Sequence, residues 1–426
     1  MQYHFPDYYY TFQCIGSLCP DTCCAGWNIE IDSISLANYK KLIHDSNQGW
    51  PLKARDPFFA DLKKAVDFRN KTFRLSERRC PLLTEDNLCG MYLHLGKNSL
   101  CRTCRTYPRH QEEFGNLREI SLSLSCPEAA RIILSQPSRP VLISRETMME
   151  CPSDQLVDES LLSWLLAARE RILDILWDLR RPFEISVAMA LAFAHDLQRR
   201  HLDQRYYEPS SQDEEPFFNL DLALEDLDAL TRNYLAPKAE ERFSEQVRRL
   251  NARKRKDSDG GKRDTGHVSL LPSALLHLYS DLEPVVENWP RLLSGCHFLP
   301  SYDSLQERQL LTYFIQVYFP GAIYDDDIFG KIQFAAASLL MTRMLCGALL
   351  SDSEKEIPPA DLFTKAAYLY SRQTENSDSN LNAVFDALQT RRPFQFYEFL
   401  AYFSQNPSCG SSTEDLSDRL TERNFS

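Results

Sequence analysis

The chain has 426 residues, of which 43% are hydrophobic and 25% are charged, and its formal net charge is −12. This length is sufficient for two or three domains with a full hydrophobic core. The negative charge argues against non-specific nucleic-acid binding, because a phosphate backbone would be repelled. Only 14 residues are glycine, which argues against a fold built on glycine-rich phosphate loops.

The N-terminal segment MQYHFPDYYYTFQC lacks the basic region and apolar run of a secretory signal. The two most apolar stretches contain Pro320 and Arg343, and this favours buried helices over membrane spans. We therefore expect a soluble, cytoplasmic protein without a membrane span. The cytoplasm keeps thiols reduced, so structural disulfides are not expected.

The N-terminal part is distinguished by its cysteines, because nine of the 13 lie in the first 126 residues. Residues 71–76 and 118–125 alternate apolar and polar side chains, as half-buried strands do. Residues 33–45 have helical spacing behind Asp32 or Ser33 as a possible N-cap. Residues 1–150 are therefore predicted to form a small cysteine-rich α+β domain.

Beyond residue 150 the pattern becomes helical, and a helical body is predicted over residues 151–405. Helices are expected at residues 159–180, 184–201, 270–289, 306–319 and 327–350. The charged, glycine-containing segment 250–267 predicts a mobile loop. Residues 406–426 predict a polar tail. The predicted fold class is α+β, with a predominantly α-helical C-terminal body.

The N-terminal cysteines are the strongest chemical signal in the chain. They are Cys14, Cys19, Cys23, Cys24, Cys80, Cys89, Cys101, Cys104 and Cys126. Zinc sites and iron–sulfur clusters both commonly use four thiolates. Such a density predicts a metal or cluster site, in preference to a scatter of small buried side chains or to disulfides, which the odd total disfavours.

The spacing of these cysteines restricts the kind of site. The two-residue spacer between Cys101 and Cys104 lets both thiolates bind one metal, whereas adjacent Cys23 and Cys24 are expected to supply one ligand per metal. The pattern matches neither zinc ribbons nor ferredoxins. A radical-type adenosylmethionine motif would need a third cysteine at Gly26. Ligand type alone does not separate zinc from iron, so both remain open.

Six segments together carry a resemblance to a known family. They are FQCIGSLCPDTCCAGWNIEID, CPLLTEDNLCGMYLHLGKNSLCRTCRTYPR, EISLSLSCPEAARIIL, LLTYFIQVYF, KIQFAAASLL and YLYSRQTENSDSNLNAVFDAL. They resemble the flagellin lysine-N-methylase family of bacteria, and the likeness extends over nearly the full chain. The N-terminal part is similar to a widespread cysteine-rich domain described as zinc- or iron-chelating.

The resemblance implies methyl transfer from S-adenosylmethionine to lysine side chains of flagellin. It also implies an iron–sulfur cluster, with a 4Fe–4S cluster favoured over zinc. One departure is visible, because the family tends to have a histidine where this chain has Asn376. If that histidine removes a proton in the family, the residue with that role is missing at this position of the chain.

Lysine reacts with a methyl donor only as the neutral amine. With an ordinary pKa near 10.4, deprotonation at pH 7 costs about 4.6 kcal/mol. The segment YSRQTE offers Tyr370, Arg372 and Glu375 as candidate catalytic residues. Arg372 could pair with a carboxylate, and Glu375 could orient or deprotonate the amine. A buried Arg–Glu pair that braces two helices is the structural alternative.

The remaining signals are weaker. No G-x-G-x-x-G segment is present, so the residues that bind S-adenosylmethionine are not identified. Asp325, Asp326 and Asp327 could attract a lysine-rich partner or simply begin a solvated helix.

A hypothesis from a different class is an iron–sulfur or zinc protein that transfers electrons or handles metal without methylation. A pure electron carrier rarely needs so large a helical body, which favours the enzyme.

Overall fold

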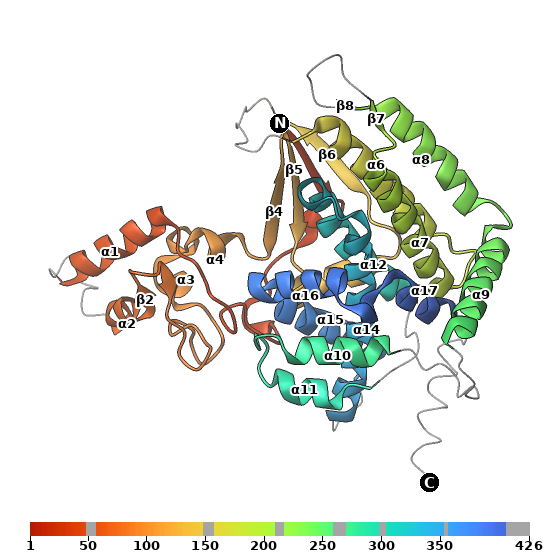
Figure 1. Ribbon diagram of the computed structural model, residues 1–426. Coiled ribbons are helices and arrows are strands. Elements are labelled where there is room, and N and C mark those ends of the chain that lie inside the picture. The colour runs from red at the N-terminus through yellow and green to blue at the C-terminus, as the bar shows by residue number, and fades with distance from the viewer. Residues whose placement is uncertain are drawn as a thin grey trace, which may run out of the picture.

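The computed structural model describes residues 1–47, 57–147, 157–208, 217–258, 270–297, 304–352 and 357–405. Its fold class is α+β, as predicted, with one four-stranded sheet, two short strand pairs and a large helical body. The sheet stands at one end of the body, and a smaller lobe that contains α1 to α4 projects to one side (Figure 1).

The four-stranded sheet has the order β4-β5-β1-β6. Strand β1 (Gln2–Pro6) is parallel to β5 (Leu117–Leu122) and antiparallel to β6 (Leu142–Glu146), while β4 (Arg109–Phe114) forms a hairpin with β5. The predicted strand at residues 118–125 is therefore confirmed in its first part. Its last residues leave the sheet and lead into helix α5 (Pro127–Leu134).

The short strand pairs are β2 (Val66–Asp67) with β3 (Thr72–Phe73) and β7 (Tyr207–Glu208) with β8 (Phe217–Phe218). The predicted strand at residues 71–76 is thus reduced to two residues.

The cysteine-rich lobe, residues 14–47 and 57–107, has its own small core. Its helices are α1 (Ser33–Asn47), α2 (Pro57–Ala65), α3 (Gly90–Leu95) and α4 (Arg102–Thr106). Short 3-10 turns lie at Gly16–Leu18 and Lys97–Ser99, and another precedes the lobe at Tyr9–Thr11. The buried core includes Ile29, Ile31, Leu36, Tyr39, Phe58, Leu62, Phe73, Leu82 and Met91, together with Cys80 and Cys101.

Asp32 is the N-cap of α1, as predicted, and it also joins α1 to α4. Its Oδ1 accepts a hydrogen bond from the backbone N–H of Ser35 at 2.9 Å, and its Oδ2 accepts one from Arg102 at 2.8 Å. These backbone donors lower the pKa of Asp32 from 3.8 to about 2.

Asp32→Ala should therefore lower the free energy of unfolding of the lobe by about 1–2 kcal/mol. Because the pKa is depressed in the folded state, this stabilisation is present above pH 3.8 and is lost as the pH falls towards 2. Denaturant unfolding of both proteins at several pH values measures the difference. Asp45→Ala, on an exposed part of α1, should change stability by less than about 0.5 kcal/mol, and an equal loss there would contradict the capping role.

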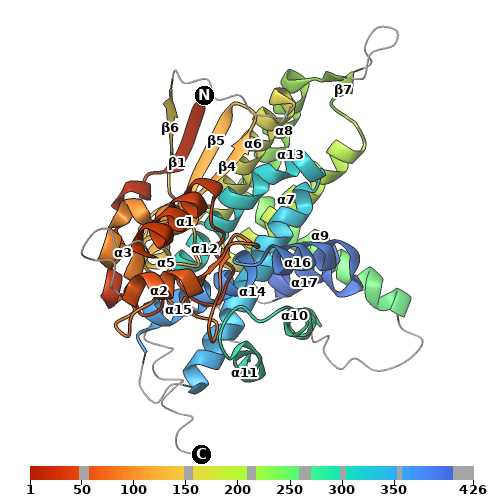
Figure 2. The same ribbon diagram turned by 90° about the vertical axis from the view of Figure 1, so that its left-hand side faces the viewer.

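The helical body is built around α14, which packs against α7, α11, α12 and α15. Figure 2 shows this arrangement from the side of the lobe. The helices are α5 (Pro127–Leu134), α6 (Glu159–Leu176), α7 (Phe183–Leu202), α8 (Leu220–Leu235), α9 (Ala239–Ser258), α10 (Leu271–Ser280), α11 (Trp289–Gly295), α12 (Ser304–Tyr318), α13 (Ala322–Asp325), α14 (Ile328–Asp352), α15 (Pro359–Glu375), α16 (Asp378–Thr390) and α17 (Phe396–Gln405). Two 3-10 turns lie at Phe319–Gly321 and Arg392–Phe394.

The body and the main sheet share one hydrophobic core. Phe5 and Tyr8 near β1, and Leu122 and Leu124 at the end of β5, belong to the same buried cluster as the helices. The predicted domain boundary near residue 150 stays a prediction, but the packing places the sheet and α5 with the helical body. The lobe has a core of its own, and a small third cluster of Phe114, Leu117 and Leu162 joins the sheet to α6.

Helix α14 contains a segment, residues 328–351, that is long and apolar enough to cross a membrane. In the protein, 89% of its most apolar window is buried, as in the central helix of a folded core.

Three predicted helix or loop bounds differ from the structure. Helix α6 ends at Leu176, because Asp178 forms a tight turn with Arg181 before α7. The loop predicted at residues 250–267 is wrong for residues 250–258, which continue α9. The rest of that loop and the predicted tail 406–426 lie outside the described residues. The helix predicted at residues 270–289 ends at Ser280, and α11 begins only at Trp289.

The lobe is attached to the body next to α15. Gly26 has a φ of +87°, and a Cβ there would lie 2.6 Å from the carbonyl oxygen of Val285. Arg78 donates to the same oxygen at 2.5 Å. Gln373 of α15 accepts hydrogen bonds from the backbone N–H groups of Val285 and Val286 at 2.9 and 3.1 Å. The C-terminal end of α15 therefore lies where the body meets the cysteine-rich lobe.

Candidate functional site

The end of α15 carries all three predicted catalytic residues, and it directs them to different surroundings. Successive helical residues point in different directions, so Tyr370, Arg372 and Glu375 have separate neighbours. Glu375 faces α12, Arg372 faces the cysteine-rich lobe, and Tyr370 faces the interior.

Glu375 is held by three hydroxyl groups. Its Oε1 accepts hydrogen bonds from Tyr313 at 2.9 Å and from Tyr318 at 2.7 Å, both on α12, and its Oε2 accepts one from Ser371. Burial raises the pKa of Glu375, while the three hydroxyl donors and the positive charge of nearby His110 act in the opposite direction. A carboxylate with a raised pKa is a stronger base than an ordinary one, as proton abstraction requires.

His110 lies on β4 with its side chain exposed, and its Nε2 is 2.5 Å from Oε1 of Glu112. This hydrogen bond raises the pKa of His110, and the charge of Glu375 contributes in the same direction. A histidine therefore lies close enough to Glu375 to influence its charge, although the residue that follows Glu375 in sequence is Asn376.

Tyr370 is fully buried and belongs to a hydroxyl chain. Its hydroxyl is 2.6 Å from that of Tyr279 and 2.8 Å from that of Ser338. Burial is the main cause that raises the pKa of Tyr370 to about 12. These contacts are typical of a core tyrosine, and its catalytic role stays a prediction.

Arg372 links the body to the cysteine-rich lobe. Its Nη1 is 2.6 Å from Oδ2 of Asp21, and its Nε donates to the carbonyl oxygen of Ser125 at 2.8 Å. The side chain is 7% exposed, and its Nη2 is a buried donor without a hydrogen-bond partner among the described residues. Arg372 thus pairs with a carboxylate, as predicted, but that carboxylate is Asp21, whereas Glu375 is bound by hydroxyl groups.

Several of the predicted metal-binding thiols come together in the lobe. Cys24 hydrogen-bonds to both Cys23 and Cys89, and Cys104 hydrogen-bonds to Cys101. Charge on Cys23 or Cys89 would also act on Cys104, so the two sets are neighbours. Cys80 lies near the same group, where burial raises its pKa to about 11.

Two thiols of this group lie at helix N-termini. Cys89 is the N-cap of α3 and Cys101 is the N-cap of α4. A hydrogen bond from Cys24, with help from backbone N–H groups, lowers the pKa of Cys89 to about 6. A hydrogen bond from Cys104 lowers the pKa of Cys101. These positions favour thiolate, which is the form that binds metals.

Two further predicted thiols, Cys19 and Cys126, lie close enough to Cys23 for its charge to contribute to raising the pKa of each. Burial raises the pKa of Cys19 and, to about 12, that of Cys126, which is the N-cap of α5. Cys14 is exposed. Across the described part of the chain, no three His, Cys, Asp or Glu side chains have the geometry to hold a metal ion. The thiols are free and gathered, but the metal site stays a prediction.

The weaker charged candidates have ordinary roles in the structure. Asp325 pairs with Lys331, Asp326 accepts a hydrogen bond from His201 at 2.9 Å, and Oδ1 of Asp327 accepts one from the backbone N–H of Gly330 at 2.8 Å. Intramolecular partners thus account for all three carboxylates, which favours the structural interpretation of this triplet.

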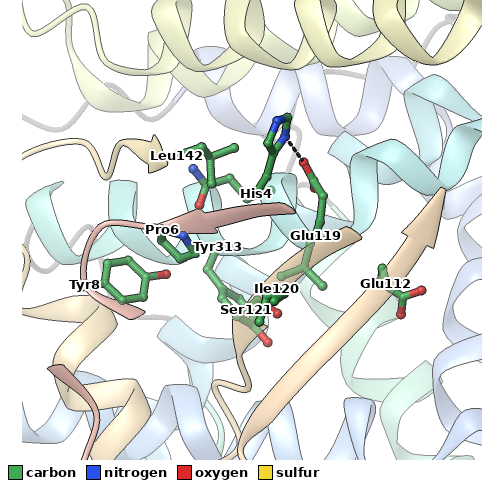
Figure 3. Close-up of a pocket in the computed structure, with 11 residues that line it drawn as sticks. His4, Pro6, Tyr8, Glu112, Glu119, Ile120, Ser121, Leu142 and Tyr313 are labelled. Carbon is green, nitrogen blue, oxygen red and sulfur yellow. Dashed lines mark hydrogen bonds and ion pairs between the residues drawn. The ribbon is translucent and has the colours of Figure 1, made fainter. Parts of the chain in front are cut away.

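Two cavities are candidates for binding a small group or ligand. The first lies between β1, β5 and α12 and has a volume of about 20 Å³, enough for one or two water-sized groups. Figure 3 shows the residues that line it, among them His4, Tyr8, Glu112, Glu119 and Tyr313.

The second cavity has a volume of about 460 Å³ and lies between α10 and α11. It would suit a small organic ligand, but none of the predicted site residues lines it. Its walls include Leu276, His277, Leu282, Trp289 and Leu293.

Four residues of the site carry no signal of their own in the sequence. Tyr313 and Tyr318 lie in an apolar stretch that predicts only a buried helix, and His110 belongs to an exposed strand. Asp21 lies within the cysteine motif, in which only the cysteines indicated a function. Their relation to Glu375 and Arg372 depends on contacts between segments far apart in the chain.

Part of the chain is similar in sequence to known proteins. The chain is 32% identical over 145 residues to proteins named Lysine-N-methylase from Salmonella choleraesuis (strain SC-B67) and Salmonella typhimurium (strain LT2), a stretch that covers 34% of this chain and 35% of each relative. It is also 32% identical over 137 residues to the Flagellar biosynthetic protein FliU of Salmonella muenchen, covering 32% of this chain and 79% of the relative. The chain thus spans about a third of the length of these lysine-N-methylases. No solved structure matches the chain significantly.

Residues 169–401 match the family described as FliB lysine N-methylase C-terminal domain. This range covers more than half of the 426 residues and includes α12 and α15, which supply Tyr313, Arg372 and Glu375. The chain belongs to the FliB lysine N-methylase C-terminal domain family.

Proposed function

We propose that this protein is a methyltransferase that methylates lysine side chains of flagellin, with S-adenosylmethionine as the methyl donor. The observation that carries the proposal is the family match over residues 169–401. The relatives named Lysine-N-methylase support the reaction, and the relative named Flagellar biosynthetic protein FliU supports a flagellar substrate.

Within this reaction, Glu375 is the proposed base. It lies at the end of a family-matched helix, its pKa is raised by burial, and three hydroxyl groups hold it in position. Loss of a proton from the lysine leaves a neutral amine, which attacks the methyl group in a single displacement. Positioning of the two reactants then supplies most of the remaining rate enhancement.

Arg372 is proposed to bind an anionic group at the boundary between lobe and body. One of its guanidinium nitrogens is buried without a partner in the described structure, and Cys19 and Cys23 are close enough for its charge to lower their pKa values. Arginine suits such a role because it remains charged when buried. The residues that bind S-adenosylmethionine stay unassigned.

An iron–sulfur cluster, with zinc as the alternative, is proposed from the chemistry of the donors. Cys23, Cys24, Cys89, Cys101 and Cys104 form one neighbourhood of thiols, and such ligands suit either metal. No step of the methyl transfer is assigned to this group.

Serine replacements should separate ligands from bystanders. Cys89→Ser or Cys101→Ser should remove most of the bound metal, because each deletes a thiolate of the gathered set. Cys14→Ser should retain it, because Cys14 is not among the thiols that act on Cys24 and Cys104. Elemental analysis for iron and zinc, together with the visible absorption spectrum of protein purified without oxygen, provides the measurement. Equal metal loss in the Cys14 variant, or an unmodified protein without metal, would contradict the proposal.

The reaction itself is tested with labelled S-adenosylmethionine and purified flagellin. Label on flagellin lysines supports the function, and none on any lysine overturns it. A metal-containing protein without methylation would favour the alternative, a protein that transfers electrons or handles metal, which the gathering of thiols in the lobe also suits.

The proposed location is the cytoplasm, where flagellin is made and thiols stay reduced.

A further inference from the structure

The small cavity between β1, β5 and α12 combines acidic and apolar walls. Pro6 and Leu142 supply apolar surface, and Glu112 and Glu119 supply carboxylates (Figure 3). Val317 adds apolar surface to the wall. Apolar walls suit the methylene chain of a lysine, and carboxylates attract its ammonium group. The volume of about 20 Å³ accepts a group as small as an ammonium and is far too small for an adenosyl group.

The two carboxylates differ in the number of positively charged partners that they already have. Glu119 accepts hydrogen bonds from Arg169 at 2.6 and 2.9 Å and is 3.4 Å from His4. Glu112 is half-exposed, with His110 as its partner. Glu112 is therefore the carboxylate better placed to meet a second positive charge.

Tyr313 connects this cavity to Glu375. It lines the cavity, and its hydroxyl donates to Oε1 of Glu375 at 2.9 Å while it accepts from the backbone N–H of Leu124 at 3.2 Å. A phenol oxygen can accept two hydrogen bonds, so one position is open to a further donor. Tyr8, also in the cavity wall, lies close enough for its charge to affect the Tyr313 hydroxyl.

We propose that this cavity binds the ammonium group of the substrate lysine and that Tyr313 relays its proton to Glu375. This inference rests on the proposed lysine methylation. One N–H bond of the ammonium breaks as the phenol oxygen takes that proton, and the phenol O–H bond breaks as its proton moves to Oε1 of Glu375. The products are a neutral amine, an intact tyrosine and a protonated carboxyl group, so atoms and charge balance.

The groups around Glu375 support this direction of transfer. Ser371 lies on its own helix, Tyr313 and Tyr318 face it from α12, and His110 approaches from β4. Tyr370, on the same helix, has its hydroxyl in the buried chain with Tyr279 and Ser338. Positive charge on His110 favours the ionised form of Glu375, which accepts the proton, and burial favours the protonated form that results.

Tyr313→Phe tests the relay, because phenylalanine keeps the ring and removes only the hydroxyl. At pH 7, kcat for lysine methylation should fall about 10²-fold with little change in KM. The loss should shrink towards pH 10, because lysine then loses its proton to solvent near its ordinary pKa of about 10.4. A matched control is Tyr234→Phe, which deletes a hydroxyl that donates to Asp196 at 2.9 Å and should leave kcat unchanged at every pH.

The outcomes are distinguishable. If the unmodified protein methylates no lysine, the proposed function fails. If it does so and Tyr313→Phe is equally active, the relay is overturned while the proposed function stands. A loss of kcat that is the same at every pH would show a structural role only, and would also overturn the relay. Glu112→Gln should raise KM for a lysine-containing peptide several-fold, and an unchanged KM would argue against the cavity as the ammonium site.

Discussion

Glu375→Gln should lower the rate of lysine methylation about 10²–10⁴-fold, the usual contribution of a general base. Glutamine keeps an oxygen that can accept the hydrogen bonds of Tyr313 and Tyr318, but it cannot take a proton at neutral pH. The defect should therefore appear in kcat, and it is measured as transfer of labelled methyl groups to flagellin.

The pH dependence gives this prediction a second test. Burial raises the pKa of Glu375 above its ordinary value of 4.5, and the ionised form is the active base. The activity of the unmodified protein should therefore increase as the pH rises through that pKa, and Glu375→Gln should lose this step. The stability contributed by protonated Glu375 is complete below pH 4.5 and is lost as the pH rises through the folded-state pKa. The glutamine variant is thus expected to be no less stable at neutral pH.

Asp196→Asn is the matched control, because Asp196 also accepts a hydrogen bond from a tyrosine, Tyr234, at 2.9 Å. Its rate should stay within about twofold of the unmodified protein. Full activity of Glu375→Gln would remove Glu375 as the base and leave only a structural role for the end of α15.

Arg343→Met should lower the free energy of unfolding by about 3–5 kcal/mol. Arg343 lies on α14, where its Nε is 2.6 Å and its Nη2 is 2.8 Å from the two carboxylate oxygens of Glu307, and Nη2 is also 3.3 Å from Glu184. All three side chains are at most 2% exposed. Methionine fills similar space but supplies no charge, so two buried carboxylates lose their shared cation. Denaturant unfolding provides the measurement.

A second arginine with two carboxylate partners serves as the control. Arg139 pairs with Glu170 and Asp174, but the three side chains are 23%, 46% and 35% exposed, and water screens such pairs. Arg139→Met should cost less than about 1 kcal/mol. Adding Glu307→Gln to Arg343→Met should restore part of the lost stability, because one buried carboxylate is then neutral. A cost below about 1 kcal/mol for Arg343→Met would show that this ion network is not a major source of stability.

Local patterns in the sequence identified five helices of the body, α6, α7, α10, α12 and α14, and the cap of α1. An apolar stripe of period 3.6 is a property of one segment, and so is an aspartate before a helix that needs a capping acceptor. Arg343 argued against a membrane span, and its buried ion pairs agree with that interpretation. Helix α9 was not predicted, and its last residues were assigned to a loop, because charged residues such as those at 250–258 are found in exposed helices as well as in loops.

The sequence also identified the thiols as a group, because nine cysteines within 126 residues far exceed what a reduced protein needs as small buried side chains. Which of them are neighbours depends on tertiary structure. Cys24 and Cys89 are 65 positions apart in the numbering, yet their thiols hydrogen-bond. The thiols of adjacent Cys23 and Cys24 also hydrogen-bond, and the expectation that they supply one ligand per metal stays a prediction.

By itself, the sequence determined the fold class, the concentration of thiols in the N-terminal part and the family likeness, because composition, periodicity and motif spacing are all local. Only the tertiary structure decided that Arg372 pairs with Asp21. It also decided that Glu375 accepts hydrogen bonds from Tyr313 and Tyr318. These contacts join segments that lie far apart in the chain, and they arise from how α15, α12 and the lobe pack. No pattern within one segment encodes that packing.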